Sequence, residues 1–491
     1  MEHSALQIFK ALSFTVWQAF LSMLIALCIG LCASYYAAKK KSLFARFLSS
    51  LSAVPLCVPP LLVALGFVLF YGMNGTANRF LVSVFSLKES PLSFLYSFTG
   101  IIIAHGFYNF PLVMRTCADV WESLPEEEEQ AAALLGASKW RVFRTITLYQ
   151  LSSSIASSCI LVFLYCFFSF IIVLLFGSVG GTTIEVEVYR AARITMDYRY
   201  AGILAVIETL TALLIVYVYS IVEGKGKKST GNKLINRLKT PITTISEKII
   251  AIVLFSLIFL FFLSPFFSIP LKALFTQSSF SSLFSRKGFY SSLYTTVITA
   301  SSSAFLSVLI GFTFALVCRF LDPYKKSRIL RIIPLIPIAV SSIVLGFILI
   351  MILNKLHIRS NTAVLVFAQT LLIWPFAYRQ IVSHMDRIPL CIDEASSILS
   401  PRFFPRITKV YIPLCNRGLV SAFAFCFAIS AGDASLPLVL AVPRSETLAL
   451  FTYRLAGSYR FAEACACGTI LMIISMIVFF MGDTLNGTRD R

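Results

Sequence analysis

Long uncharged apolar runs alternate with short polar segments along this chain from its first residues to its last. Residues 12–38 carry no charged side chain, over a length that crosses a hydrocarbon core of about 30 Å. The pattern predicts an all-α polytopic membrane protein, because a chain in lipid must satisfy its backbone polar groups within helices. We predict about 11 transmembrane helices, near residues 12–38, 54–75, 93–114, 151–176, 200–222, 249–271, 293–318, 332–353, 361–378, 417–441 and 462–482.

Composition supports this prediction and limits the function classes. The chain is 58% hydrophobic and 13% charged, with mean hydropathy +0.84. Its net charge of +19 does not indicate nucleic acid, because Lys and Arg lie in short loops between apolar runs. With the N-terminus outside, the richer set of basic residues, including Lys39–Lys41 and the cluster at 319–331, falls on the cytoplasmic side, as the positive-inside rule requires.

Two polar loops repeat at a constant difference in residue number, as in Phe110 and Trp374 (374 − 110 = 264), which we call the repeat offset. The repeat predicts two homologous halves: residues 1–222 with a loop at 115–150, a basic cytoplasmic linker at 223–248, and residues 249–491 with a loop at 379–413. A membrane protein with the same cytoplasmic segment twice is expected to dock onto a partner with two equivalent sites. No phosphate-binding loop is visible in this chain, so the energy source is expected in that partner.

The first loop contains a helix start. Ser123 is expected to cap the helix with Glu126 reaching back, and Pro125 suits the first turn. The acidic run 126–129 places negative charge at the positive end of the helix dipole, while Gly136 ends or bends the helix.

Both loops resemble the EAA loop of ATP-binding-cassette importer permeases, whose pattern is E-A-A-x-x-x-G followed by I-x-L-P. The resemblance implies coupling helices that bind two copies of an ATPase subunit on the cytoplasmic face, with ATP and Mg held by that partner and no cofactor in this chain. The implied coupling residues are Pro125, Glu129, Gln130, Ala131, Ala132, Gly136, Pro389, Glu394, Ala395, Ser396, Ser400 and Pro413. Gln130 stands where the family has Glu, and Ser400 where it has Gly, so we expect the loops to contribute unequally.

Two halves fused in one chain resemble the iron(III)/thiamine group of these permeases, and segments such as 105–111, 182–185 and 457–460 are similar to its thiamine permeases. The resemblance implies a type I importer permease fold in a bacterial cytoplasmic (inner) membrane, lacking one peripheral helix of the first half. It also implies alternating access, with a periplasmic or lipid-anchored binding protein that delivers thiamine or its phosphates. An iron(III) permease remains the alternative within the class.

Several charged residues are candidates outside the loops. A carboxylate in a span, such as Asp433 or Glu208, either faces the substrate path, where it would offset a cationic thiazolium, or makes a structural hydrogen bond. The polar segments 177–199 and 457–460 are expected to be external loops, and Glu185, Arg190, Tyr459 and Arg460 are candidates for contact with the binding protein. Solvated loop charge is the competing interpretation.

No metal site is predicted, because the 4 His lack ligand spacing and the 12 Cys mostly lie in apolar segments. A secondary transporter would also contain repeats, but these are often inverted, whereas both loops here face the cytoplasm. No nucleophile with a base and an orienting group supports a membrane enzyme.

Overall fold

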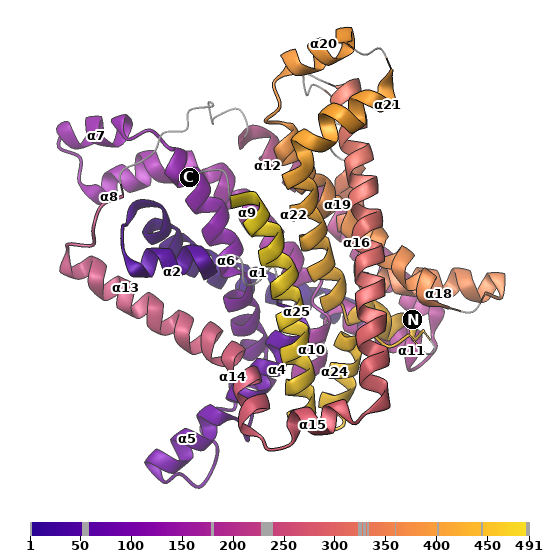
Figure 1. Ribbon diagram of the computed structural model, residues 1–491. Helices are drawn as coiled ribbons and strands as arrows, with labels where there is room; N and C mark the ends of the chain where they lie inside the picture. The colour runs from indigo at the N-terminus through magenta and orange to yellow at the C-terminus, as the bar shows by residue number, and fades with distance from the viewer. Residues whose placement is uncertain are drawn as a thin grey trace. The chain divides into compact units, whose positions relative to one another are not determined.

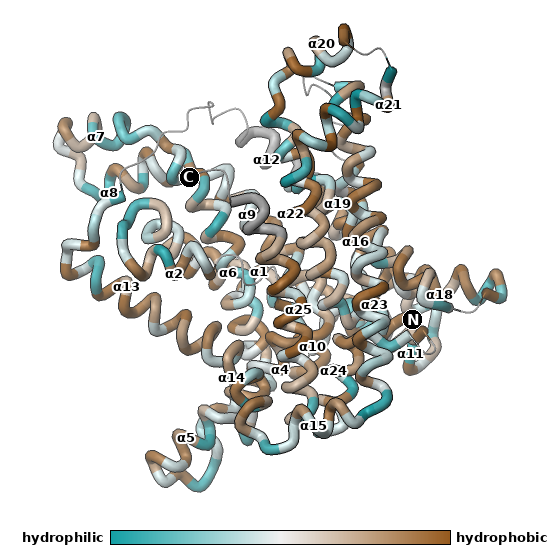
Figure 2. The backbone as a smooth tube through the Cα atoms, viewed as in Figure 1, coloured by the Kyte–Doolittle hydropathy of each residue, from teal (hydrophilic) through white to brown (hydrophobic). Residues whose placement is uncertain are grey.

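The computed structural model describes residues 2–51, 58–177, 181–226, 239–322, 327, 330, 333–358, 360–399, 402–442 and 445–487. Regular structure in these ranges is helical, and the one bridge between extended residues joins Lys40 to Thr240. The predicted all-α class is confirmed. Apolar residues line the long helices, and hydrophilic residues gather at their ends and in the loops (Figure 2).

Within the described ranges, nine helical segments are long and apolar enough to cross a membrane. They are Ala5–Lys39, Pro60–Phe85, Lys139–Phe167, Tyr198–Tyr219, Ile245–Phe275, Lys287–Leu321, Thr362–Met385, Phe404–Gly432 and Phe461–Met481. Two further predicted spans differ from these nine. Helix α6 (Phe98–Ser123) is long enough to cross a membrane but less apolar than the nine, because it carries polar residues such as His105 and Asn109, which are buried within the protein. The span predicted at 332–353 is shortened to α18 (Ser342–Leu356), because a 3-10 segment containing Pro337, η4 (Ile333–Ala339), precedes it.

The chain divides into two compact units, which we describe separately. Most of the first unit comes from residues 1–268, and most of the second from residues 269–491. The boundary between the units differs from the boundary between the predicted halves. Residues 249–268 belong to the second half of the sequence repeat but pack with the first unit.

In the first unit, three helices pack against one another: α1 (Glu2–Lys39), α6 and α9 (Leu148–Phe167). Helix α12 (Tyr198–Gly226) lies against α9, while α2 (Leu43–Leu51) and α13 (Ile245–Ile258) lie against α1 (Figure 1). The second unit repeats this plan, with α16 (Lys287–Leu321), α19 (Thr362–Met385), α22 (Ile412–Gly432) and α25 (Phe461–Gly487) in contact. Each of α6 and α19 contains one proline, Pro111 and Pro375, and these two are separated by the repeat offset.

The repeat extends far beyond the polar loops. Elements whose first residues are separated by the repeat offset are α6 and α19, α8 (Lys139–Val142) and α21 (Phe403–Arg406), η2 (Phe143–Thr147) and η5 (Ile407–Tyr411), α9 and α22, α10 (Ile171–Phe176) and α23 (Ser435–Leu440), and α11 (Ile184–Arg193) and α24 (Leu448–Gly457). Before α6 the difference is larger, because α4 (Pro60–Tyr71) begins at Pro60 and its counterpart α18 at Ser342 (342 − 60 = 282). The first half therefore holds 18 additional residues between these helices (282 − 264 = 18), in the segment that contains α5 (Thr76–Phe85) and η1 (Phe94–Tyr96).

The end of the basic linker is attached to the first unit. Lys239 donates to Glu122 at 2.7 Å, and backbone hydrogen bonds join Thr240 to Lys39 and Lys41 at 3.0 and 2.9 Å. A few residues later, the carboxylate of Glu247 pairs with the Lys40 ammonium at 2.8 Å. Residues 239–247 are thereby held against the C-terminal end of α1.

Candidate functional site: two equivalent interhelical loops

The first loop (residues 124–147) begins where Pro125 ends α6. Leu124 is extended, with ψ 137°, as expected for a residue that precedes proline. Helix α7 (Glu127–Leu134) then starts with three glutamates, whose negative charge interacts favourably with the positive end of the helix dipole. The predicted cap by Ser123 is wrong, because its hydroxyl donates to the Val120 carbonyl at 2.7 Å within α6. Pro125 lies before α7 rather than in its first turn.

Gly136 ends α7 by adopting a left-handed conformation with φ +82°. Its N–H donates to the Ala133 carbonyl, and the Ala137 N–H donates to the Ala132 carbonyl, which satisfies the last carbonyls of the helix. The equivalent Ser400 lies outside the described residues, as does Pro401. The second loop (residues 388–411) is described on both sides of this gap.

Glu129 fixes the first loop to the bundle of the first unit. Its carboxylate pairs with the ammonium of Lys39, at the end of α1. It also accepts a hydrogen bond from the Thr147 hydroxyl at 2.8 Å, just before α9. Glu128 adds a hydrogen bond from Gln150 of α9 at 2.6 Å, so α7 is attached to the ends of two long helices.

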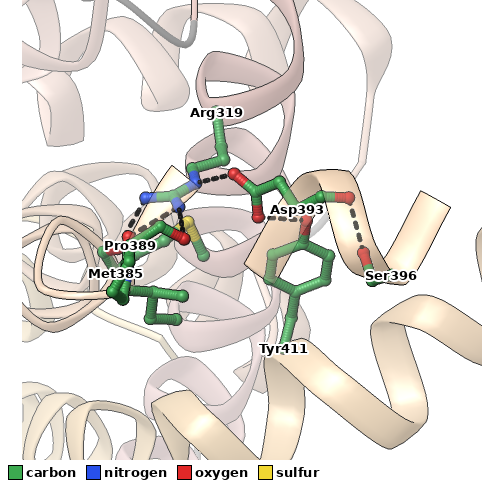
Figure 3. A network of polar contacts seen from close by, with 7 residues as sticks. Arg319, Met385, Pro389, Asp393, Ser396 and Tyr411 are labelled. Carbon is green, nitrogen blue, oxygen red and sulfur yellow. Dashed lines mark hydrogen bonds and ion pairs between the residues drawn. The ribbon is translucent and has the colours of Figure 1, made fainter. Parts of the chain in front are cut away.

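Asp393 does the same in the second loop, from helix α20 (Leu390–Leu399) (Figure 3). Its carboxylate accepts from Arg319 Nε at 2.8 Å and from the Tyr411 hydroxyl at 2.7 Å. The Arg319 guanidinium also donates to the carbonyls of Met385 and Ile388, at 2.8 and 2.7 Å, at the end of α19. One arginine, 7% exposed at its side chain, therefore joins α16, α19 and α20.

The two attachments are equivalent in sequence as well as in chemistry. Glu129 and Asp393 are separated by the repeat offset, and so are their hydroxyl donors Thr147 and Tyr411. We call each carboxylate with its basic partner and hydroxyl donor an anchor. The sequence analysis included Glu129 but missed Asp393, Lys39, Arg319, Thr147 and Tyr411. Applying the offset to Glu129 would have identified Asp393.

The residues aligned with the family's EAA motif lie on the other side of the short helices. Gln130 and Glu394 are exposed, as are Ala131 and Ala395, so a partner can reach them. Ser396 is instead buried and donates to the carbonyl of Asp393 at 2.9 Å.

The remaining predicted loop residues shape the helix ends. Ala132 is half-buried beside the exposed face of α7. The Pro389 carbonyl accepts the Ile392 N–H and starts α20, while Pro413 lies in the first turn of α22. Each loop returns to the bundle through a π-helical turn, η2 or η5, a geometry that is often found at functional sites.

Each loop exposes the same apolar set. In the first loop Leu134, Leu135 and Trp140 are 89%, 89% and 69% exposed. Their equivalents at the repeat offset in the second loop are Ile398, Leu399 and Phe404, which are 82%, 86% and 74% exposed. Two aliphatic side chains followed by an aromatic ring thus form a repeated exposed apolar surface.

Asp433 lies at a break in a predicted span. Helix α22 ends at Gly432 and α23 begins at Ser435, so the span expected at 417–441 is interrupted. The Asp433 carboxylate accepts the N–H groups of Ser435 and Leu436 at 2.9 and 3.4 Å, and so compensates backbone donors that the break leaves without helical partners. The span predicted at 151–176 is broken in the same way between Phe167 and Ile171.

The candidates outside the loops have different environments. Glu208 is buried on α12. The segment around Glu185, which was predicted to be a loop, is helix α11. Glu185 is only 1% exposed there, so the prediction that it is accessible to a binding protein is wrong. Arg190 is exposed and pairs with Glu187 at 3.3 Å.

Tyr459 and Arg460 lie between α24 and α25. Tyr459 is 85% exposed, and Arg460 is 3.9 Å from Glu463. Both remain accessible to a partner. Among the described residues no group of three or more His, Cys, Asp or Glu could hold a metal ion.

Comparison with known proteins agrees with this arrangement. Residues 29–224, from within α1 to the end of α12, match the family described as binding-protein-dependent transport system inner membrane component. Over these residues the chain is similar to such permeases. Its membrane segments and this family make it a multi-pass inner-membrane protein.

The relatives match nearly the whole chain. It is 26% identical over 484 residues to the thiamine transport system permease protein ThiP of Escherichia coli (strain K12), covering 96% of this chain and 88% of that protein. The ThiP of Brucella abortus (strain 2308) is 26% identical over 502 residues, covering 98% and 88%. The ferric transport system permease protein FbpB of Actinobacillus pleuropneumoniae is 25% identical over 460 residues, covering 89% of this chain and 65% of that protein.

Proposed function

We propose that this permease imports thiamine or its phosphates and is driven by a separate ATPase that binds both loops. The ATPase proposal rests on one observation: both loops contain an anchor and an apolar set, and the equivalent residues are separated by the repeat offset. A partner that contacts both loops in the same way must present two equivalent sites, and two copies of one ATPase subunit provide them. ATP and Mg²⁺ would be held by that partner.

The anchors supply a physical route for coupling. A partner that pulls α7 applies force to α1 through the Glu129–Lys39 pair and to α9 through Thr147. In the second unit Asp393 transmits the same force to α16 through Arg319 and to α22 through Tyr411. Because these side chains bridge helix ends directly, motion of the loop becomes motion of the membrane helices.

Contact with a substrate-binding protein is proposed on the opposite membrane face, where Arg190, Tyr459 and Arg460 are accessible. Their mixture of an exposed aromatic ring and guanidinium groups is typical of residues that dominate protein interfaces. In this proposal the binding protein selects the solute and the permease provides the path.

The substrate proposal rests on the relatives named for thiamine transport, which cover nearly the whole chain. The ferric relative supports iron(III) as the second candidate. The discriminating experiment reconstitutes this chain with its ATPase and each binding protein in vesicles and measures uptake of labelled thiamine, its mono- and diphosphate, and iron(III). Thiamine uptake that requires ATP is expected. ATP-dependent iron uptake without thiamine would overturn the substrate, and uptake of either without ATP would overturn the coupling mechanism.

A further inference from the structure

Residues 72–97, which we call the hairpin, run from the end of α4 to the start of α6 and carry α5 and η1. The segment between the equivalent helices of the second half, α18 and α19, is much shorter. The 18 additional residues fall between α4 and α6, in the segment that carries α5. The helical plan of the second unit is complete without them, so the hairpin is not needed to build the bundle.

The hairpin lies at the membrane end opposite the first loop. Helix α6 begins at Phe98, directly after the hairpin, and ends at Ser123, directly before the first loop. Its 26 residues span about 39 Å at 1.5 Å per residue, which exceeds the thickness of the hydrocarbon core. In the first unit α5 and α7 accordingly lie at opposite ends of α6 (Figure 1). The hairpin is therefore at a membrane boundary.

Asn78 holds the hairpin in one orientation. This side chain is completely buried, and its amide donates to the carbonyls of Gly72 and Leu92 at 2.9 and 2.8 Å. Its oxygen accepts the Leu92 N–H at 2.8 Å. Ser90 adds a hydrogen bond to the Met73 carbonyl at 2.7 Å, which closes the base of the hairpin. The outward face of α5 is thus fixed by its attachment to the bundle.

That fixed outward face is apolar. The exposed apolar side chains on α5 and immediately beside it are Met73, Phe80, Val84, Phe85 and Leu87, which are 50%, 65%, 56%, 65% and 41% exposed. Thr76 and Ser83 of α5 are exposed as well. Phe80 and Val84 are one helical turn apart on α5, so they form a single stripe. Two basic residues, Arg79 and Lys88, are exposed beside it. A rigid apolar stripe with flanking positive charge requires an explanation other than chance exposure.

We propose that α5 lies in the lipid interface of the external leaflet, with its apolar stripe against acyl chains and Arg79 and Lys88 near lipid phosphates. Helix α5 follows α4 after a short turn at residues 72–75, and the stretch Pro60–Phe85 as a whole has the apolar composition of a membrane segment, so the stripe adjoins lipid-facing surface. Helices with one apolar aromatic face and basic neighbours bind such interfaces. The hairpin then anchors the first half at the face opposite the ATPase loops.

The test measures thiol accessibility with one chain per nanodisc, made of phosphatidylethanolamine and phosphatidylglycerol, so that only lipid can cover α5. Phe80→Cys and Val84→Cys are compared with Glu89→Cys, an exposed position of the same hairpin. A membrane-impermeant maleimide is applied, and mass spectrometry resolves each labelled peptide from those of the 12 native cysteines.

Labelling of both helix variants about tenfold slower than Glu89→Cys, or more, is expected if the stripe is embedded in lipid. Equal labelling rates would overturn the proposal and leave the stripe open to a protein partner. The measurement needs neither ATPase nor transport activity, so its outcome is independent of the proposed function.

Discussion

Asp393→Ala is the sharpest test of the anchor. It removes the carboxylate from Arg319 and from Tyr411 but leaves the guanidinium its three carbonyl acceptors. Breaking a fully buried pair costs about 3–5 kcal/mol. Because the Asp393 side chain is 17% exposed and Arg319 keeps its bonds to these carbonyls, we expect about 2–3 kcal/mol for local detachment of α20.

This loss is measurable by hydrogen exchange of the α20 amides, which reports local opening. Since each 1.4 kcal/mol is a factor of ten, residues 390–399 should exchange about 30- to 150-fold faster in Asp393→Ala. Tyr411→Phe removes one hydrogen bond and should give about fivefold. Glu394→Ala, at the adjacent exposed position, is the matched control and should leave exchange within about twofold of the wild type.

The functional consequence in the reconstituted importer is uncoupling. With α20 detached from α16, the ATPase still binds the exposed apolar set, but its motion is no longer transmitted. We expect Asp393→Ala to keep ATP hydrolysis and lose most uptake. Unchanged exchange of residues 390–399, or unchanged uptake in a variant whose α20 exchanges faster, would refute the anchor reasoning.

Three further predictions concern other parts of the loops and the break in α22. Leu135→Ser and Leu399→Ser should each weaken binding of the ATPase about tenfold or more and leave membrane insertion unchanged, because each removes one apolar contact. Titration of labelled ATPase onto nanodiscs measures this binding. Undiminished binding of the double variant would exclude the apolar set as the docking surface. Gly136→Ala places a Cβ at φ +82°, where no atom obstructs it but the backbone is strained by about 1–2 kcal/mol. Amides of α7 should then exchange roughly 5- to 30-fold faster, and exchange as in the wild type would contradict the helix-end assignment. Asp433→Asn keeps an oxygen acceptor for α23 and should leave thiamine uptake within about twofold, whereas a large loss would assign the charge to the substrate path.

The sequence predicted the spans well because lipid imposes one requirement on every helix, namely a sufficiently long apolar run. Its errors occur where local chemistry competes with that rule. Ser123 fits a cap in the sequence, but its hydroxyl bonds back into α6, as serines readily do. The sequence does not indicate the break at Asp433, because the residues around it are apolar. The carboxylate is the one local feature that points to it, since it accepts a backbone N–H that the helix leaves unbonded.

The candidate loops were predicted from duplication, and duplication also explains what was missed. The motif directs attention to Gln130 and Glu394, whose side chains face outward. The anchoring carboxylates precede them by one position and differ in type, Glu in one loop and Asp in the other. Their basic partners lie on α1 and α16, far away in sequence, so only folding brings them to the loops.

The two anchors restrain their loops by different means. Arg319 uses three nitrogens to bind the Asp393 carboxylate and the carbonyls of Met385, Ile388 and Pro389, a geometry that a planar guanidinium fixes and an ammonium does not. Lys39 makes a single pair with Glu129, but its backbone carbonyl holds Thr240, and the next residue, Lys40, pairs with Glu247. In the first half the restraint thus passes from one side chain to the linker that follows α12. The second loop is held through Asp393 by Arg319 and Tyr411, so the two attachments use different contacts although their exposed surfaces match.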